Sequence, residues 1–255
     1  MSVLQTQGAP PQPLTRHVAS TIVAALLACA AGAWLLTAVQ ARSMAMGGMA
    51  MLGVGLFMAT WLVMMVAMMF PAVAPMVVAH ARVARWRGEG SWPTVAFIAG
   101  YLLVWTLAGV VPLVAGRSLP SLDGTLAARL GGAVILAAGL YQLTPLKQAC
   151  LRACRSPLGF ILAHDFGGGS QSAVRAGLSH GLFCLGCCWA LMAVLAVVGL
   201  MNLAWMAILA TVFFVEKRWR YGVALSRIVG AACLVIGLTV LLRPDVLDRL
   251  RGPMG

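Results

Sequence analysis

The sequence predicts an all-α protein, a polytopic transmembrane helical bundle with about seven spans. Of its 255 residues, 62% are hydrophobic and only 9% are charged, whereas soluble domains average roughly 45–50% apolar and about 25% charged residues. The apolar residues come in runs of about 20, the length that a helix needs to cross a bilayer. The basic residues lie mainly in the short segments between these runs, as is typical of membrane proteins.

Seven apolar runs follow one another along the chain. Before them, residues 1–17 form a proline-containing polar tail that we expect to be disordered. The first run could also be a signal peptide, but its 22 residues exceed the about 7–15 of a signal-peptide core, so we expect a retained helix. Residues 18–242 then form a single transmembrane helical domain, and residues 243–255 form a C-terminal tail. Six of the expected helices cover residues 18–39, 49–80, 95–115, 126–146, 176–200 and 221–242. The remaining one is short: it follows a turn at Met201 and Asn202 and ends at residue 215.

The distribution of lysine and arginine predicts the orientation. Counted over alternate connecting segments, twelve basic residues fall on one side and six on the other. The richer side should be cytoplasmic, which places the N-terminus inside and, with seven spans, the C-terminus outside. The formal charge of +12 is therefore assigned to contacts with the lipid bilayer and its anionic headgroups, and no nucleic-acid partner is expected.

Two prolines interrupt the second run. Pro71 and Pro75 each remove a backbone donor, so the carbonyl groups four residues earlier lose their helical partners. Such carbonyls persist in a membrane only where protein, water or an ion satisfies them. The segment is either an ordinary kinked helix or a bent helix that faces a site.

Methionine is concentrated in the same run. Ten of the fifteen methionines lie between residues 44 and 76. Thioethers are soft, uncharged donors that suit Cu(I), although methionine also serves as a flexible apolar filler. An outer cluster comprises Met44, Met46, Met49 and Met51, and the run continues with Met58, Met64, Met65, Met68 and Met69.

The cysteines give the sharper signal. Cys184, Cys187 and Cys188 are spaced i, i+3 and i+4, so their thiols share one helix face. His180 precedes them by one helical turn and Met192 follows by one turn. Cys150 and Cys154 form a second pair among Lys147, Arg152 and Arg155, cations that should lower their thiol pKa values. Cys29 and Cys233 are expected to be ordinary buried residues.

This donor set favours Cu(I). One or two thiolates with Cu(I) give a site close to neutrality, and buried net charge is costly; zinc is the alternative metal. Disulfides within either group are not expected, because same-helix bridges strain the required geometry. The adjacent Glu216 and Lys217 are either functional or an interfacial ion pair. The candidate metal ligands are Cys184, Cys187, Cys188, Cys150, Cys154, His180, Met192, Met64, Met65, Met68 and Met69.

Several of these residues belong to longer motifs, which cover most of residues 50–220. They are Trp61-x-x-Met64-Met65-x-Ala67-Met68-Met69-x-Pro71, Tyr141-Gln142-Leu143-Thr144-Pro145-Leu146-Lys147-x-x-Cys150-Leu151-x-x-Cys154-Arg155-x-Pro157, Gly181-x-x-Cys184-x-Gly186-Cys187-Cys188-Trp189, Gly199-x-Met201-Asn202 and Glu216-Lys217. The chain thereby resembles the bacterial family of predicted metal-binding integral membrane proteins, some members of which look like membrane copper chaperones that help metallate copper oxidases such as tyrosinase. The resemblance implies a multi-pass protein of the bacterial inner membrane that handles metal, with copper as the metal and a copper-dependent enzyme or another membrane subunit as partner.

Three functions compete at this point. The first is binding of Cu(I) for uptake or for delivery to a cuproenzyme. The second is a membrane thiol–disulfide relay, which requires thiols that pair between helices. The third is a non-catalytic scaffold subunit, in which the cysteines are dispensable. No phosphate-binding loop or hydrolase nucleophile motif is present, so ATP-driven pumping is unsupported. We expect a protein that is not an enzyme.

Overall fold

The computed structural model of the chain describes residues 13–43, 53–118, 124–163 and 168–252, and within these ranges it contains helices and no strands. The all-α prediction is therefore confirmed. The outer methionine cluster (Met44, Met46, Met49 and Met51) lies outside the described residues. The helices are α1 Pro13–Ser43, α2 Val54–Trp86, α3 Trp92–Ala108, α4 Val110–Ser118, α5 Gly124–Gln142, α6 Pro145–Arg155, α7 Pro157–Ala163, α8 Ser170–Val198, α9 Leu203–Arg218, α10 Gly222–Leu242 and α11 Asp245–Arg251.

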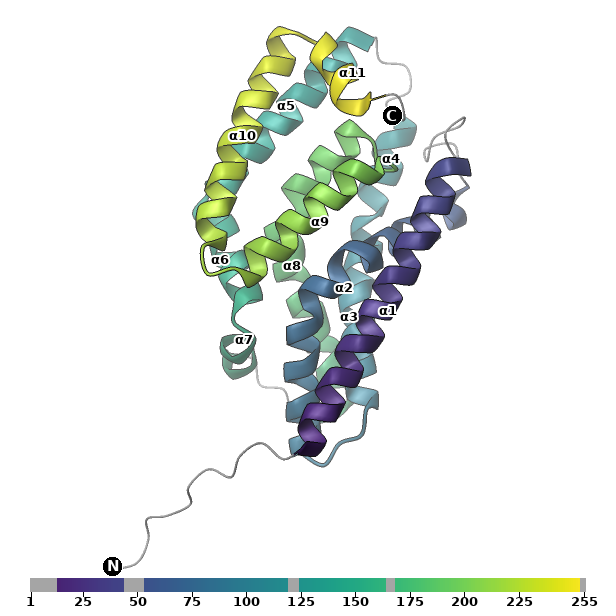
Figure 1. Cartoon of the computed structure of the whole chain (residues 1–255), viewed down its shortest axis with the longest axis vertical. Helices are drawn as coiled ribbons and strands as arrows, with labels where there is room; N and C mark the ends of the chain where they lie inside the picture. Colours follow the sequence, from purple (N-terminus) through teal and green to yellow (C-terminus); the bar gives the residue numbers. More distant parts are fainter. Residues whose placement is uncertain (1–12, 44–52, 119–123, 164–167, 253–255) are drawn as a thin grey trace, which may run out of the picture.

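Six of the described helices are long and apolar enough to cross a membrane, with α3 and α4 counted together as one. The predicted short helix is α9, whose 16 residues fall below the about 17–25 residues of a typical span. It nevertheless connects α8 to α10, and Figure 1 shows these three helices running in alternating directions. Asn202 begins α9 as its N-cap, because its side chain accepts a hydrogen bond from Trp205 N at 3.2 Å.

The helix boundaries differ from the expected runs at several places. The fourth run ends at Gln142, and a separate helix, α6, begins at Pro145. Thr144 caps α6 by accepting a hydrogen bond from Lys147 N at 3.2 Å, and proline at the first helical position needs no donor there. Helix α1 starts within the stretch expected as tail, and the C-terminal stretch includes α11. Helix α2 continues through both Pro71 and Pro75.

Glycines bring two pairs of helices into close contact. A Cβ atom at Gly100 of α3 would lie 2.5 Å from Val174 O of α8, and one at Gly177 of α8 would meet Phe97 O of α3. Helices α5 and α10 approach each other in the same way, since a Cβ atom at Gly237 would lie 2.5 Å from Leu136 N. Small residues at helix contacts are typical of membrane bundles. The α3 contact fixes the position of α8, the helix that carries the cysteine motif.

Candidate metal centre

Three thiols from two helices meet in the interior. Cys154 of α6 and Cys184 and Cys187 of α8 place their sulfur atoms within 4.8 Å of one another. Two sulfurs bound to the same ion are separated by at most about 4.6 Å, because metal–sulfur bonds measure about 2.3 Å. This group, which we call the thiol cluster, therefore has dimensions close to those of a single metal site.

Cross-helix and same-helix contacts both hold the thiol cluster together. Cys187 Sγ lies 3.8 Å from Cys154 Sγ and 3.4 Å from Cys188 Sγ. Tyr101 Oη of α3 lies 3.2 Å from Cys184 Sγ. Cys184, Cys187 and Cys188 are each about 1% exposed, whereas Cys154 is half-buried. Cys154 is thus the least buried residue of the thiol cluster.

A positive charge lies against the thiol cluster. Lys217, near the end of α9, is buried, and its Nζ donates to Cys184 Sγ at 3.1 Å. An ammonium at this distance can balance the negative charge of a thiolate. From the sequence, Lys217 was singled out only together with Glu216, as a motif and as a possible ion pair.

Glu216 forms its ion pair with another lysine. Lys147 Nζ of α6 lies 2.8 Å from Glu216 Oε2, with both side chains at most 1% exposed. Gln142 Nε2 donates to Glu216 Oε1 at 3.2 Å, and Lys147 Nζ also donates to Cys187 O. Glu216 thus forms an ion pair, but a buried one with Lys147, and its neighbour Lys217 instead donates to Cys184 Sγ. The buried pair joins α6 and α9 to the backbone of α8 at the thiol cluster.

The expected lowering of the α6 thiol pKa values is also wrong. Burial raises the pKa of Cys150, and the ammonium of Lys147 offsets only part of this effect. Hydrogen bonding to Cys184 is the main cause that raises the pKa of Cys154. Arg155, the sequence neighbour of Cys154, instead donates to Glu216 O at 2.6 Å.

Two of the predicted ligands, Cys150 and His180, lie near the thiol cluster but do not belong to it. Cys150 faces Gly186 of α8, where an added Cβ atom would come within 2.7 Å of its sulfur. His180 is buried, with ring-centroid distances of 6.0 Å to Tyr101 and 5.1 Å to Phe160. Among the described residues, neither belongs to the group whose donor atoms lie within 4.8 Å.

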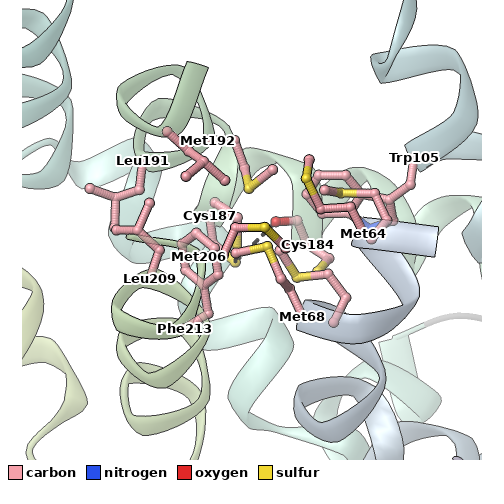
Figure 2. Packing of buried hydrophobic residues seen from close by; sticks show 14 of the residues in the cluster. Met64, Met68, Trp105, Cys184, Cys187, Leu191, Met192, Met206, Leu209 and Phe213 are labelled. Carbon is pink, nitrogen blue, oxygen red and sulfur yellow. Dashed lines mark hydrogen bonds between the residues drawn. The ribbon is translucent and has the colours of Figure 1, made fainter. Parts of the chain in front are cut away.

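The predicted methionine ligands are all buried in the same core. Met64, Met65, Met68 and Met69 of α2 are at most 1% exposed, and Met192 of α8 is 5% exposed. Figure 2 shows Met64, Met68 and Met192 around Cys184 and Cys187, with their thioethers directed into the same region.

Helix α9 adds one thioether that the sequence did not indicate. Met206 of α9 is completely buried and is drawn in the same group in Figure 2. It stands apart from the methionine-rich run and outside the motifs, so spacing alone gave no signal for it.

All seven cysteines are free thiols. Cys29 is exposed on α1 and Cys233 is buried on α10, and neither belongs to the thiol cluster. Cys29 thus differs from the expectation of an ordinary core residue. The two serve as natural controls for any experiment on the cluster.

Comparison with known proteins gives one family. A family model described as PpoB2, copper chaperone, matches residues 58–240. The match includes every residue of the thiol cluster, both buried lysines and the methionines of α2 from Met58 onward. No curated protein and no solved structure matches the chain.

Proposed function

Because the chain belongs to the PpoB2 family of copper chaperones, we propose that it is a membrane-embedded chaperone that binds copper as Cu(I) and delivers it to a copper-dependent enzyme. The single observation that carries this proposal for the chain itself is the thiol cluster, Cys154 with Cys184 and Cys187 within 4.8 Å. Copper is here the cargo of the protein.

The donor chemistry supports Cu(I) as the cargo. Thiolates and thioethers are soft ligands that select Cu(I), and thioethers add ligands without adding charge. Met64, Met68, Met192 and Met206 border the thiol cluster. Zn²⁺ more often takes four thiolate or imidazole ligands, and His180 lies outside the cluster among aromatic rings. The thiol cluster with its thioether border therefore favours Cu(I) over zinc.

We assign the predicted ligands to two roles. Cys154, Cys184 and Cys187 are the binding thiols, with Cys188 in contact with Cys187. The buried methionines are weaker ligands through which copper enters or leaves the thiols, and exchange between uncharged donors keeps each step reversible. Cys150 and His180 border the site and are not proposed as primary ligands.

Membrane insertion is supported by the six helices that are long and apolar enough to cross a bilayer, because a bilayer solvates such helices and water does not. We propose the bacterial inner membrane as the location of the chain, as the family resemblance implies, and a cytoplasmic N-terminus on the basis of the distribution of basic residues. Helix α6 and the end of α9, which supply Cys154 and Lys217, would then lie toward the cytoplasmic side.

A competition titration with a Cu(I) chelator tests the binding site. The variant with Cys184→Ser and Cys187→Ser should lose at least about 10-fold in Cu(I) affinity, or about 1.4 kcal/mol. Cys29→Ser is the matched control, because this thiol is exposed on α1, and it should bind as the wild type does. Equal affinity of all three proteins would exclude the thiol cluster as the copper site.

A thiol–disulfide relay is the second candidate, and one distance favours it. Cys154 and Cys187 come from different helices with their sulfurs 3.8 Å apart, as cross-helix pairing requires. Such a relay would exchange this dithiol with a disulfide of a partner protein, whose two sulfurs leave as thiols while the Cys154–Cys187 bond forms. Trapping of a mixed disulfide in cells by Cys154→Ser would support the relay, and its absence together with tight Cu(I) binding would support the chaperone.

A further inference from the structure

The contact between Lys217 and the thiol cluster bears on how many thiolates bind each copper ion. The inference rests on the proposed function, because it concerns the same site. Lysines at membrane boundaries usually extend their ammonium groups toward water. Lys217 is instead 8% exposed, and its Nζ lies 3.1 Å from Cys184 Sγ.

The two buried lysines differ in their counter-charge. Lys147 is neutralised by Glu216 at 2.8 Å, which also accepts from Gln142. The carboxylate of Glu216 is therefore paired with a lysine of α6. Lys217 Nζ instead donates to Cys184 Sγ at 3.1 Å, and this sulfur in turn lies within 4.8 Å of those of Cys154 and Cys187. One lysine is therefore part of a structural ion pair, and the other faces the metal site.

Charge balance then limits the ligand set. Buried net charge is costly, so arrangements close to neutrality are favoured. Cu(I) with two thiolates carries one negative charge, which the ammonium of Lys217 cancels. With one thiolate the site would carry one positive charge, and with three it would carry one negative charge.

We propose that Lys217 is the built-in counter-charge of the copper site and that it sets the ligation to two thiolates for each Cu(I). Cys184 is one of the two, because it contacts the ammonium directly, and Cys187 or Cys154 supplies the other. Lys217 acts through the thiols and does not touch the metal, so it is a positioning residue. Replacing it with a neutral side chain leaves a copper site in which one thiolate and thioethers give the neutral arrangement.

The test compares Lys217→Met and Lys217→Arg with the wild type and with Arg218→Met in detergent micelles. Arg218 is the next residue on α9 and is exposed, so it controls for loss of positive charge on the same helix. Two quantities are measured for each protein: Cu(I) affinity against a chelator, and the ultraviolet charge-transfer absorption of the thiolate–Cu(I) bonds. Thermal unfolding is recorded first, and Lys217→Gln replaces Lys217→Met if the latter is misfolded.

We expect Lys217→Met to bind Cu(I) at least about 10-fold more weakly and to lose about half of the charge-transfer absorption, because one of two thiolates is no longer stabilised. Lys217→Arg should recover most of both, and Arg218→Met should match the wild type. Wild-type affinity and absorption in Lys217→Met would overturn the role of Lys217 while leaving the copper site in place. Failure of the wild type itself to bind Cu(I) would overturn both the role of Lys217 and the proposed function.

Discussion

The buried ion pair between Lys147 and Glu216 gives the most direct prediction about stability. Its atoms are 2.8 Å apart, and the two side chains are 0% and 1% exposed. Glu216→Gln keeps the shape of the side chain but leaves the ammonium of Lys147 buried without a carboxylate. Removing one partner of a buried pair typically costs about 3–5 kcal/mol. We expect Glu216→Gln to lower the free energy of unfolding by an amount in this range.

Removing both charges should restore most of the stability. A variant with Lys147→Met and Glu216→Gln no longer buries a charge at these two positions, and such replacements are often close to neutral. Its free energy of unfolding should therefore lie well above that of Glu216→Gln alone, which is the signature of direct coupling between two residues. Unfolding by sodium dodecyl sulfate from mixed micelles, followed by circular dichroism, measures the wild type and both variants.

An exposed pair provides the control. Asp245 and Arg249 lie 3.6 Å apart on α11, and both side chains are more than half exposed. Exposed pairs contribute a median of about 0–1 kcal/mol, so Asp245→Asn should change stability little. The reasoning fails if Glu216→Gln is as stable as the wild type, or if the double variant is no more stable than the single one.

Three further predictions concern packing, orientation and the cargo. Gly177→Leu should destabilise the protein by at least about 1–3 kcal/mol, because the new side chain would meet Phe97 O. Gly32→Leu is the control, because open space surrounds this position, and it should leave stability unchanged. Thermal unfolding compares the two variants with the wild type. Reporter fusions should place segments 82–87 and 216–220 in the cytoplasm and the C-terminus outside, and cytoplasmic activity from a C-terminal fusion would show that the number of spans is even. Cu(I) at about 100 times its dissociation constant should stabilise the wild type by about 2.7 kcal/mol, measured as a shift in thermal unfolding, and an unchanged transition would contradict specific binding.

The helical fold was largely predictable from the sequence, because the length and composition of an apolar run are local properties. Each expected run contains a helix at nearly the expected position. The break between α5 and α6, which we did not predict, also has a local cause in Thr144 and Pro145. Proline is favourable at the first position of a helix and unfavourable in its interior. The shared face of Cys184 and Cys187 followed from their spacing in the same way.

The composition of the candidate metal site was decided by the tertiary structure. Cys154 joins Cys187 across 33 residues of sequence, and Lys147 joins Glu216 across 69. Helical periodicity reports only which residues share a face of one helix. Which faces of two helices meet depends on their rotation and relative height, and these are set by close contacts such as Gly177 against Phe97. The sequence by itself therefore determined which helices carry the thiol and thioether side chains, whereas the packing of α3, α6, α8 and α9 decided which thiols and which lysine meet.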